Sequence, residues 1–529
     1  MMHTRNLFLL LVLPLLSFSL FSQETPQDSE PDVELPELSL SFEDVFGEDL
    51  PLVELQLEEA LAPGLPELSE PEGILQVRPH SIDLPAPVFD ALPYGSDSAP
   101  LYGRGYIGLG SSNSLTGEIE IATLGADLGF GLSYSHNSLD GFGGNSPGEG
   151  YTFRREEARV KVDYSGTGAD AFFSGSFIEE ERGLQGESPF SSTLYRTMGA
   201  EGGYELPPDR GWYGGPGFDL SGAYQNLSGT SPEDTSHFTL SPVMRGGYAW
   251  SSFMLGAEGR YSFRSGSAED YIQYLRLDLN AEGDLSPRVG FIAEAGAAYI
   301  VDGDVRFPFS LLLSAGLSEN VSMEASGGYY HSLGDYAALL SSYPFLRIPE
   351  EPLAAEEGWE GDLSLRLRLG HDLYLRLGSS LTAGTRYRAG DVPEPASSLL
   401  PVVEKDVREL GPRGNLEFPL GKTFFGSFSA GLRYDYEESS MEAFDVGLGV
   451  ESEGLTSRLG LRLQGDWDLS DNDQTPVLGS EVWYEPLESI RFILGIDDAL
   501  GLLDTGGRKD DSGLEVPGFV IRFATEISL

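Results

Sequence analysis

One stretch decides the fold of this chain: Leu363-Ser364-Leu365-Arg366-Leu367-Arg368-Leu369. Every odd position in it is leucine and every even position is polar or charged. Successive side chains of a β-strand point to opposite faces, whereas side chains on one face of a helix recur about every 3.6 residues. The stretch therefore predicts a strand with one apolar face and one wet face. The same period of two recurs in residues 275–280, 373–377 and 458–463.

The connections between such segments also alternate, in length. Short links lie at residues 285–288, 318–320, 371–372, 420–422 and 487–489, and longer polar links at 137–150, 183–191, 333–357, 389–406 and 501–515. Short turns at one rim and long loops at the other are typical of an outer-membrane barrel. Residues 101–529 divide into 22 segments of roughly 20 residues, the size of a tilted spanning strand with its connection. We therefore predict an all-β, transmembrane, antiparallel β-barrel with both ends at the periplasmic rim.

Two segments precede this barrel. Residues 1–23 predict a signal peptide, because Arg5 precedes the apolar run 7–16 and small residues follow. That run is shorter than the ~20 residues a spanning helix needs. Residues 24–100 contain nineteen acidic side chains, a single basic one (Arg78) and twelve prolines, which predicts a largely disordered periplasmic leader. Its short alternating segments 38–42 and 52–57 suit addition to the sheet edge of a periplasmic partner. The alternative is a tether without a specific partner.

Composition excludes several classes of function. The chain has 84 acidic and 33 basic side chains, a net charge of −51 and no cysteine. A nucleic-acid binder needs a basic face, and disulfides, thiolate metal sites and cysteine nucleophiles need cysteine. Residues 144–148 have Gly-x-Ser-x-Gly spacing but no helix follows, and His136, His237 and His331 are scattered. We predict no catalytic residue, cofactor or metal site, and rank an outer-membrane hydrolase last.

Alternation also predicts which charges face the lumen. The candidates are Arg276, Arg366, Arg368, Arg376, Arg458, Arg462, Asp278 and Glu282. These arginines either attract the acidic leader or pair with wall acids such as Asp278, Glu282 and Asp362. A barrel of about 22 strands is wide enough to require a plug. A periplasmic partner, the leader, or inward collapse of the long loops could supply one.

Two segments resemble a known family. The run Tyr343-Pro344-Phe345-Leu346-Arg347-Ile348-Pro349-Glu350 resembles the Asn-Pro-x-Leu-Lys-Pro-Glu loop of TonB-dependent receptor barrels, and Val516–Phe523 is similar to the last strand of that family. The strand count of 22 agrees with that of the family. The chain departs from the pattern at Tyr343, at Arg347 and at its last residue, Leu529. Residues 24–100 are also too few and too polar for the folded plug that members of the family carry, so we expect a barrel without its own plug.

Together these features predict the membrane component of a transport or envelope assembly in the outer membrane, with a periplasmic protein bound by residues 24–100. Ring-shaped zones of aromatic residues near the strand ends, including Tyr134, Tyr164, Trp359 and Trp483, suit contact with outer-membrane lipid. For any one of them the alternative is ordinary strand packing. The alternating closing strand suits the barrel-assembly machinery. The alternative function is a general porin or diffusion channel with a charge-lined lumen.

Overall fold

The computed structural model describes residues 101–528 apart from short segments at 125–127, 143–144, 167, 187, 207–210, 269, 302, 344, 371, 391–398, 422, 438–439, 457, 470–475, 488, 503–513 and 516. The predicted signal peptide and acidic leader lie outside the described residues and stay predictions. So does Gly144 of the Gly-x-Ser-x-Gly spacing.

The described chain is almost entirely strand, because alternating side chains continue through nearly every segment between turns. The elements are β1 (Leu101–Gly110), β2 (Leu115–Leu124), β3 (Leu128–Asp140), β4 (Thr152–Ser165), β5 (Asp170–Gly183), β6 (Phe190–Glu205), β7 (Trp212–Gly229), β8 (Glu233–Ala249), β9 (Phe253–Ser265), β10 (Tyr271–Ser286), β11 (Val289–Ile300), β12 (Val305–Arg306), β13 (Phe309–Ser318), β14 (Val321–Leu333), α3 (Tyr336–Ser342), β15 (Leu346–Arg347), β16 (Ala355–Gly370), β17 (Leu373–Ala389), β18 (Leu400–Pro419), β19 (Phe425–Asp435), β20 (Ser440–Thr456), β21 (Leu459–Asp468), β22 (Val477–Leu487), β23 (Ile490–Asp497), η2 (Ala499–Leu502) and β24 (Val520–Ser528).

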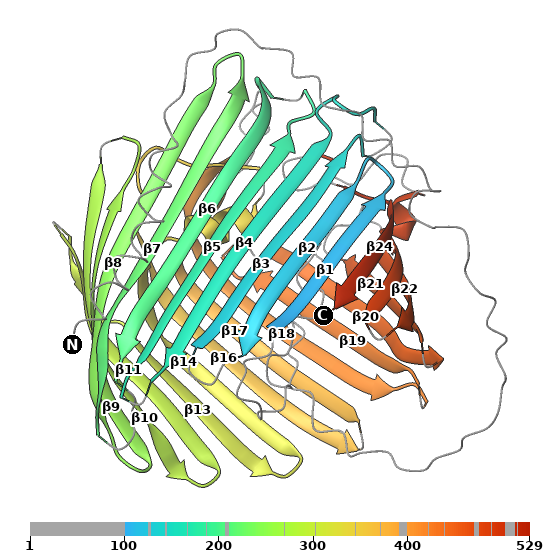
Figure 1. Ribbon diagram of the computed structural model, residues 1–529. Coiled ribbons are helices and arrows are strands. Elements are labelled where there is room, and N and C mark those ends of the chain that lie inside the picture. The colour runs from blue at the N-terminus through green and yellow to red at the C-terminus, as the bar shows by residue number, and fades with distance from the viewer. Residues whose placement is uncertain are drawn as a thin grey trace. The chain divides into compact units, whose positions relative to one another are not determined.

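The sheet closes on itself. Consecutive wall strands pair antiparallel, and β1 pairs antiparallel with β24 from Arg104 opposite Ser528 to Gly110 opposite Arg522 (Figure 1). Two of the 24 strands are two-residue additions: β12 pairs with β11, and β15 lies parallel to β18. The described wall therefore has 22 strands, which confirms the predicted fold class and strand count.

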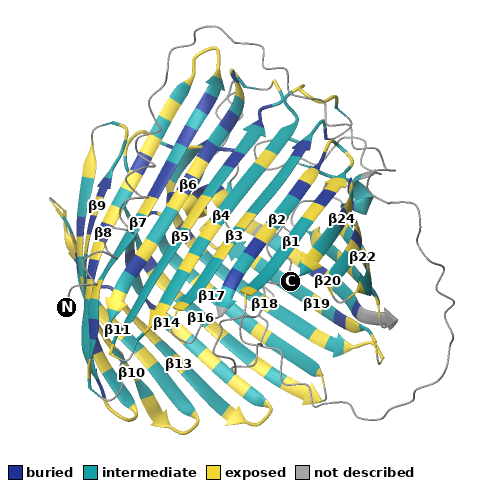
Figure 2. Cartoon of the chain, in the orientation of Figure 1, coloured by how far each residue is buried: buried dark blue, intermediate teal, exposed yellow. Residues whose placement is uncertain are grey.

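The two faces of the wall differ as the alternation predicted. Leu275, Leu277 and Leu279 of β10 are each more than half exposed, at 51%, 54% and 57%. In a closed barrel, unburied rows of large apolar side chains on one face suit contact with lipid. Buried residues gather on β6 and β7 in Figure 2. Their side chains alternate with the exposed ones, so they lie on the opposite, inner face.

Trp483 departs from the predicted aromatic zone. Its side chain is buried and packs with Ile493 and Ala524, two residues of neighbouring strands on the same face. Gly460, its partner across the β21–β22 pair, leaves room for the ring, because a Cβ atom there would lie 2.0 Å from it. Of the two alternatives for Trp483, the structure therefore supports ordinary strand packing, with the ring lying over a glycine.

The rims differ as predicted. Short turns join β10 to β11, β13 to β14 and β16 to β17, on the rim where β1 begins. The opposite rim carries the longer connections, including 334–354 between β14 and β16 and 498–519 between β23 and β24. No helix in the described part of the chain is long and apolar enough to span a membrane.

Candidate functional site

The connection between β14 and β16, residues 334–354, crosses the interior of the barrel; we call it the crossing loop. It starts and ends on β14 and β16, yet it contacts β7 and β8, which are separated from β14 along the wall by β9, β10, β11 and β13. It also contacts β18 on the other side, through β15. A segment that contacts such distant strands on their inner face must pass through the lumen from one side of the barrel to the other.

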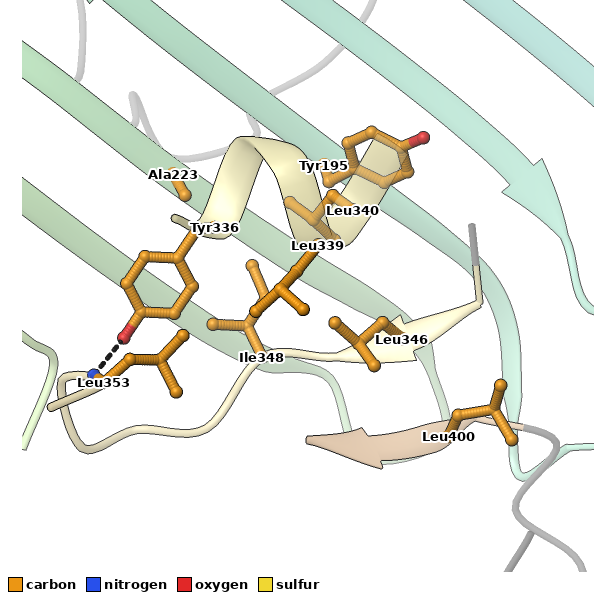
Figure 3. Packing of buried hydrophobic residues seen from close by; sticks show 9 residues of the cluster. All are labelled: Tyr195, Ala223, Tyr336, Leu339, Leu340, Leu346, Ile348, Leu353 and Leu400. Atoms are coloured by element: carbon orange, nitrogen blue, oxygen red, sulfur yellow. Dashed lines mark hydrogen bonds between the residues drawn. The ribbon is translucent and has the colours of Figure 1, made fainter. Parts of the chain in front are cut away.

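Apolar side chains fix this loop to the wall. Leu339 and Leu340 of α3 pack with Leu346, Ile348 and Leu353 farther along the loop, and all are at most 7% exposed. The cluster also contains Tyr195 of β6, Ala223 of β7, Tyr336 and Leu400 (Figure 3). Fully burying one such aliphatic side chain stabilises by about 1.5–3 kcal/mol. The loop is therefore held as part of a core.

A second apolar cluster joins several loops at the same end of the barrel. It contains Leu184, Phe190, Leu227, Phe345, Leu399 and Leu514, all at most 7% exposed. Phe345 and Leu399 are chain neighbours of Leu346 and Leu400 in the first cluster, so the two clusters adjoin. The connections β5–β6, β14–β16, β17–β18 and β23–β24 thereby contribute to one apolar layer inside the barrel.

Two glutamines hold loop backbone in place, Gln225 from the wall strand β7 and Gln185 from the β5–β6 connection. Gln225 of β7 is 2% exposed, and its Nε2 donates to Leu346 O at 2.7 Å while its Oε1 accepts from Ile348 N at 2.8 Å. Gln185 makes the same pair of bonds with Glu515, at 2.6 Å and 2.9 Å. A primary amide carries an N–H donor and a C=O acceptor side by side. Each glutamine side chain therefore makes the two hydrogen bonds that the backbone of a neighbouring strand would otherwise make with the loop.

His237 and Tyr336 hold the far end of the crossing loop. His237 Nε2 lies 2.7 Å from Pro349 O, so Nε2 carries the proton, and the Tyr336 hydroxyl lies 3.2 Å from Nδ1. Tyr336 Oη also accepts from Leu353 N at 2.8 Å, and Arg264 Nη1 donates to Leu353 O at 3.1 Å. Burial raises the pKa of Tyr336 to about 12, so this hydroxyl stays neutral at physiological pH.

We expect the substitution Gln225→Leu to loosen the crossing loop. It would leave Leu346 O and Ile348 N buried without their partner, at a cost of about 1–3 kcal/mol for each unsatisfied group. Hydrogen exchange of the Ile348 amide should accelerate by about tenfold or more, while exchange in β1 stays unchanged.

Gln464→Leu is the matched control for Gln225→Leu. The exposed Gln464 side chain lies on β21 and donates to Asp466 Oδ2 of the same strand at 2.9 Å. Equal exchange rates at Ile348 in the two variants would contradict a clamp at Gln225.

Seven of the eight predicted lumen residues lie on the wall strands, and Arg458 lies in the turn before β21. Arg276 Nε pairs with Asp278 at 2.7 Å, and Arg462 Nη2 with Glu451 at 2.9 Å. Asp362 is held by Arg413 at 2.6 Å. Glu282 lies in β10 opposite Ile292, and Arg458 directly precedes β21, where its backbone oxygen accepts from Glu485 N at 2.8 Å. Within the described chain, pairing with wall acids thus accounts for Arg276 and Arg462.

Arg366, Arg368 and Arg376 behave differently. They lie together on β16 and β17, and in the described residues none of the three has a carboxylate within ion-pair distance. Sequence reasoning selected these positions but missed Gln225, Gln185, His237 as an anchor, and Tyr336. One sequence signal for the buried loop was available: Phe345, Leu346 and Ile348 are too apolar for a loop that is exposed to water.

The three histidines occupy separate positions. His237 anchors the crossing loop on β8, and His331 on β14 has its Nδ1 3.4 Å from Tyr274 Oη. His136 on β3 lies 3.1 Å from Ser138 Oγ and 3.5 Å from Glu156. No interaction among described residues joins any two of them, and these residues hold no cluster of three or more metal-ligating side chains.

Comparison with known proteins gives matches in structure only. No family model matches the chain, and no curated protein matches its sequence. The ferric enterobactin receptor PfeA of Pseudomonas aeruginosa is similar over 82% of each chain, at 11% identity and a TM-score of 0.60. The siderophore receptor PirA of Pseudomonas aeruginosa matches 82% of this chain and 81% of its own at 13% identity (TM-score 0.56). The copper transporter OprC matches 82% and 83% at 10% identity (TM-score 0.58). At these identities the likeness is one of fold.

Proposed function

We propose that this chain, whose 22-stranded barrel has the fold of TonB-dependent receptors, is the membrane component of a transport assembly in the outer membrane and is closed by its own crossing loop. The observation that carries the proposal is the apolar layer inside the barrel, in which Leu340, Leu346 and Ile348 are at most 2% exposed. We infer from it that the loop must move before a hydrated solute passes, so that passage is conditional.

Several features favour conditional transport over catalysis or free diffusion. The similar structures are named as receptors and a copper transporter. A barrel of this width left open would leak, and many ion pairs along its wall leave a polar surface beneath the apolar layer. The histidines that a hydrolase would use are spread over β3, β8 and β14.

The acidic segment 24–100 supplies the partner half of the proposal. Nineteen acidic residues and short alternating apolar runs suit an extended segment that adds to the sheet edge of a periplasmic protein. The chain without residues 24–100 should lose capture of that partner while its barrel folds normally. Unchanged capture would remove this part of the proposal.

The competing function is a general porin, favoured by the charged wall. Purified protein in planar bilayers distinguishes the two. We expect little steady conductance from the full chain and equally little from the chain lacking 24–100, because the crossing loop lies within the barrel itself. Steady ohmic conductance of the full chain would support a porin, and conductance that appears only without 24–100 would show that the leader, and not the loop, closes the lumen.

A further inference from the structure

Three arginines that have no ion-pair partner among the described residues lie together on the inner face; we call Arg366, Arg368 and Arg376, with Tyr374, the arginine patch. Arg366 lies directly opposite Arg376, and Arg368 directly opposite Tyr374, across the β16–β17 pair. The guanidinium carbons of Arg366 and Arg368 lie 5.7 Å and 5.8 Å from the centre of the same Tyr374 ring. Two of the three guanidinium groups thus share one aromatic side chain.

Two nearby carboxylates, on β16 and β18, have other hydrogen-bond partners. Asp362, two positions before Ser364 on β16, receives Arg413 Nη2 at 2.6 Å. Glu417, opposite Tyr374 on β18, accepts from Asn415 Nδ2 at 3.1 Å. On the β14 side, the residue opposite Arg366 is Ser322. In the described chain, therefore, no acidic side chain lies within ion-pair distance of the patch.

The close placement of three arginines is unfavourable without a bound anion. Like charges directly opposite each other on paired strands repel, and each exposed cation–π contact returns only about 0.5–1 kcal/mol. Arg276, Arg462 and Arg413, on the same inner face, each have a carboxylate at 2.9 Å or less. In a chain of net charge −51, an arginine cluster without such partners is an exception that a binding role explains.

We propose that the arginine patch binds a small solute that carries two or three oxyanion groups, either carboxylates or phosphates. The planar guanidinium offers paired N–H donors that match both groups in a bidentate manner. The patch lies next to the β16–β17 turn, at the short-turn rim, whereas the crossing loop lies toward the other end. This proposal rests on the proposed function: the patch would bind an anionic substrate between the crossing loop and the short-turn rim.

Calorimetric titration of the full chain in lipid nanodiscs tests this site, with citrate as the carboxylate probe and pyrophosphate as the phosphate probe. Saturable binding is expected for at least one probe, and the tighter one identifies the group. The double variant Arg366→Gln/Arg376→Gln should bind at least about tenfold more weakly, since each hydrogen bond to a charged group contributes substantially. Arg366→Lys/Arg376→Lys keeps the charge without the planar fork and should be intermediate.

The matched control is Arg276→Gln/Arg462→Gln, which removes the same charge from paired arginines. Its affinity should stay within about twofold of the parent, because screened charges farther than a Debye length contribute little. Equal weakening in both double variants, or no saturable heat with either probe, would overturn the site. Heat-modifiable electrophoretic migration verifies that each variant is folded, and the bound probe should raise the melting temperature of the parent but not of the patch variant.

Failure of this site and failure of the proposed function are distinguishable. Titration reports on the wall near the β16–β17 turn and does not require the crossing loop to open from the outside. Bilayer conductance reports on the loop and does not require an anion.

Discussion

Replacing residues 335–353 with a short Gly-Ser turn is expected to convert a nearly silent barrel into a wide, steadily conducting pore. The replacement removes Leu339, Leu340, Leu346, Ile348 and Leu353 from the apolar layer. It also removes Phe345 from the second cluster, which then loses its contact between the β5–β6 and β17–β18 connections. Conductance in planar bilayers should rise by about tenfold or more, as expected when a barrel of this width is unblocked.

A point substitution tests the apolar packing of the crossing loop without removing the loop. Leu346→Asp places a charge at a fully buried position and should also raise conductance, because an unpaired buried charge is costly enough to expel the loop. The control is Arg347→Gln, at the exposed neighbour that pairs with Glu233, and it should remain silent. A loop-replaced barrel that still does not conduct would mean that another part of the protein closes the lumen.

The substitution Glu180→Leu is expected to destabilise the barrel by about 3–5 kcal/mol, the cost of breaking a buried ion pair by removing one partner. Glu180 is 0% exposed; Arg155 lies 3.1 Å from it and Arg182 contacts its other oxygen. Arg182 in turn lies over the rings of Phe153 and Phe345, at 4.8 Å and 5.5 Å. Loss of the Glu180 carboxylate should therefore also weaken the contact between Arg182 and Phe345 of the crossing loop. Urea unfolding in lipid vesicles measures the free energy.

The adjacent acid supplies the control. Glu179 is 12% exposed but pairs with Arg154 and Arg196, whose side chains are each 44% exposed, so Glu179→Leu should cost only about 1 kcal/mol. The crossing loop should also become more accessible to protease in Glu180→Leu than in Glu179→Leu. Similar unfolding energies for the two variants would show that Glu180 does not anchor the wall to the loop.

Local alternation was enough to predict the barrel. Leucine at every odd position of 363–369 assigned the two faces, and link lengths assigned the two rims, so closure and the count of 22 strands are confirmed. The resemblance to TonB-dependent receptors is confirmed for the barrel fold. These features depend on neighbours along the chain or on a strand and the next one.

The contents of the lumen were only partly predictable. Alternation selected Arg276 and Arg366 alike, but it could not tell that one pairs with Asp278 while the other faces Arg376. Inward collapse of the long loops was one of three possibilities, and for Trp483 both interfacial contact and ordinary strand packing were open. Each outcome depends on which side chain lies opposite, which is a property of register.

The sequence by itself determined that residues from 101 onward form a closed wall with an apolar outer face, because a period of two is read from a single strand. Only the tertiary structure decided that 334–354 crosses the lumen and is clamped by Gln225, 121 residues from Leu346. The physical reason is separation along the chain. The residues that this loop contacts lie on distant wall strands, and no local sequence pattern specifies which strands a loop inside the barrel will contact.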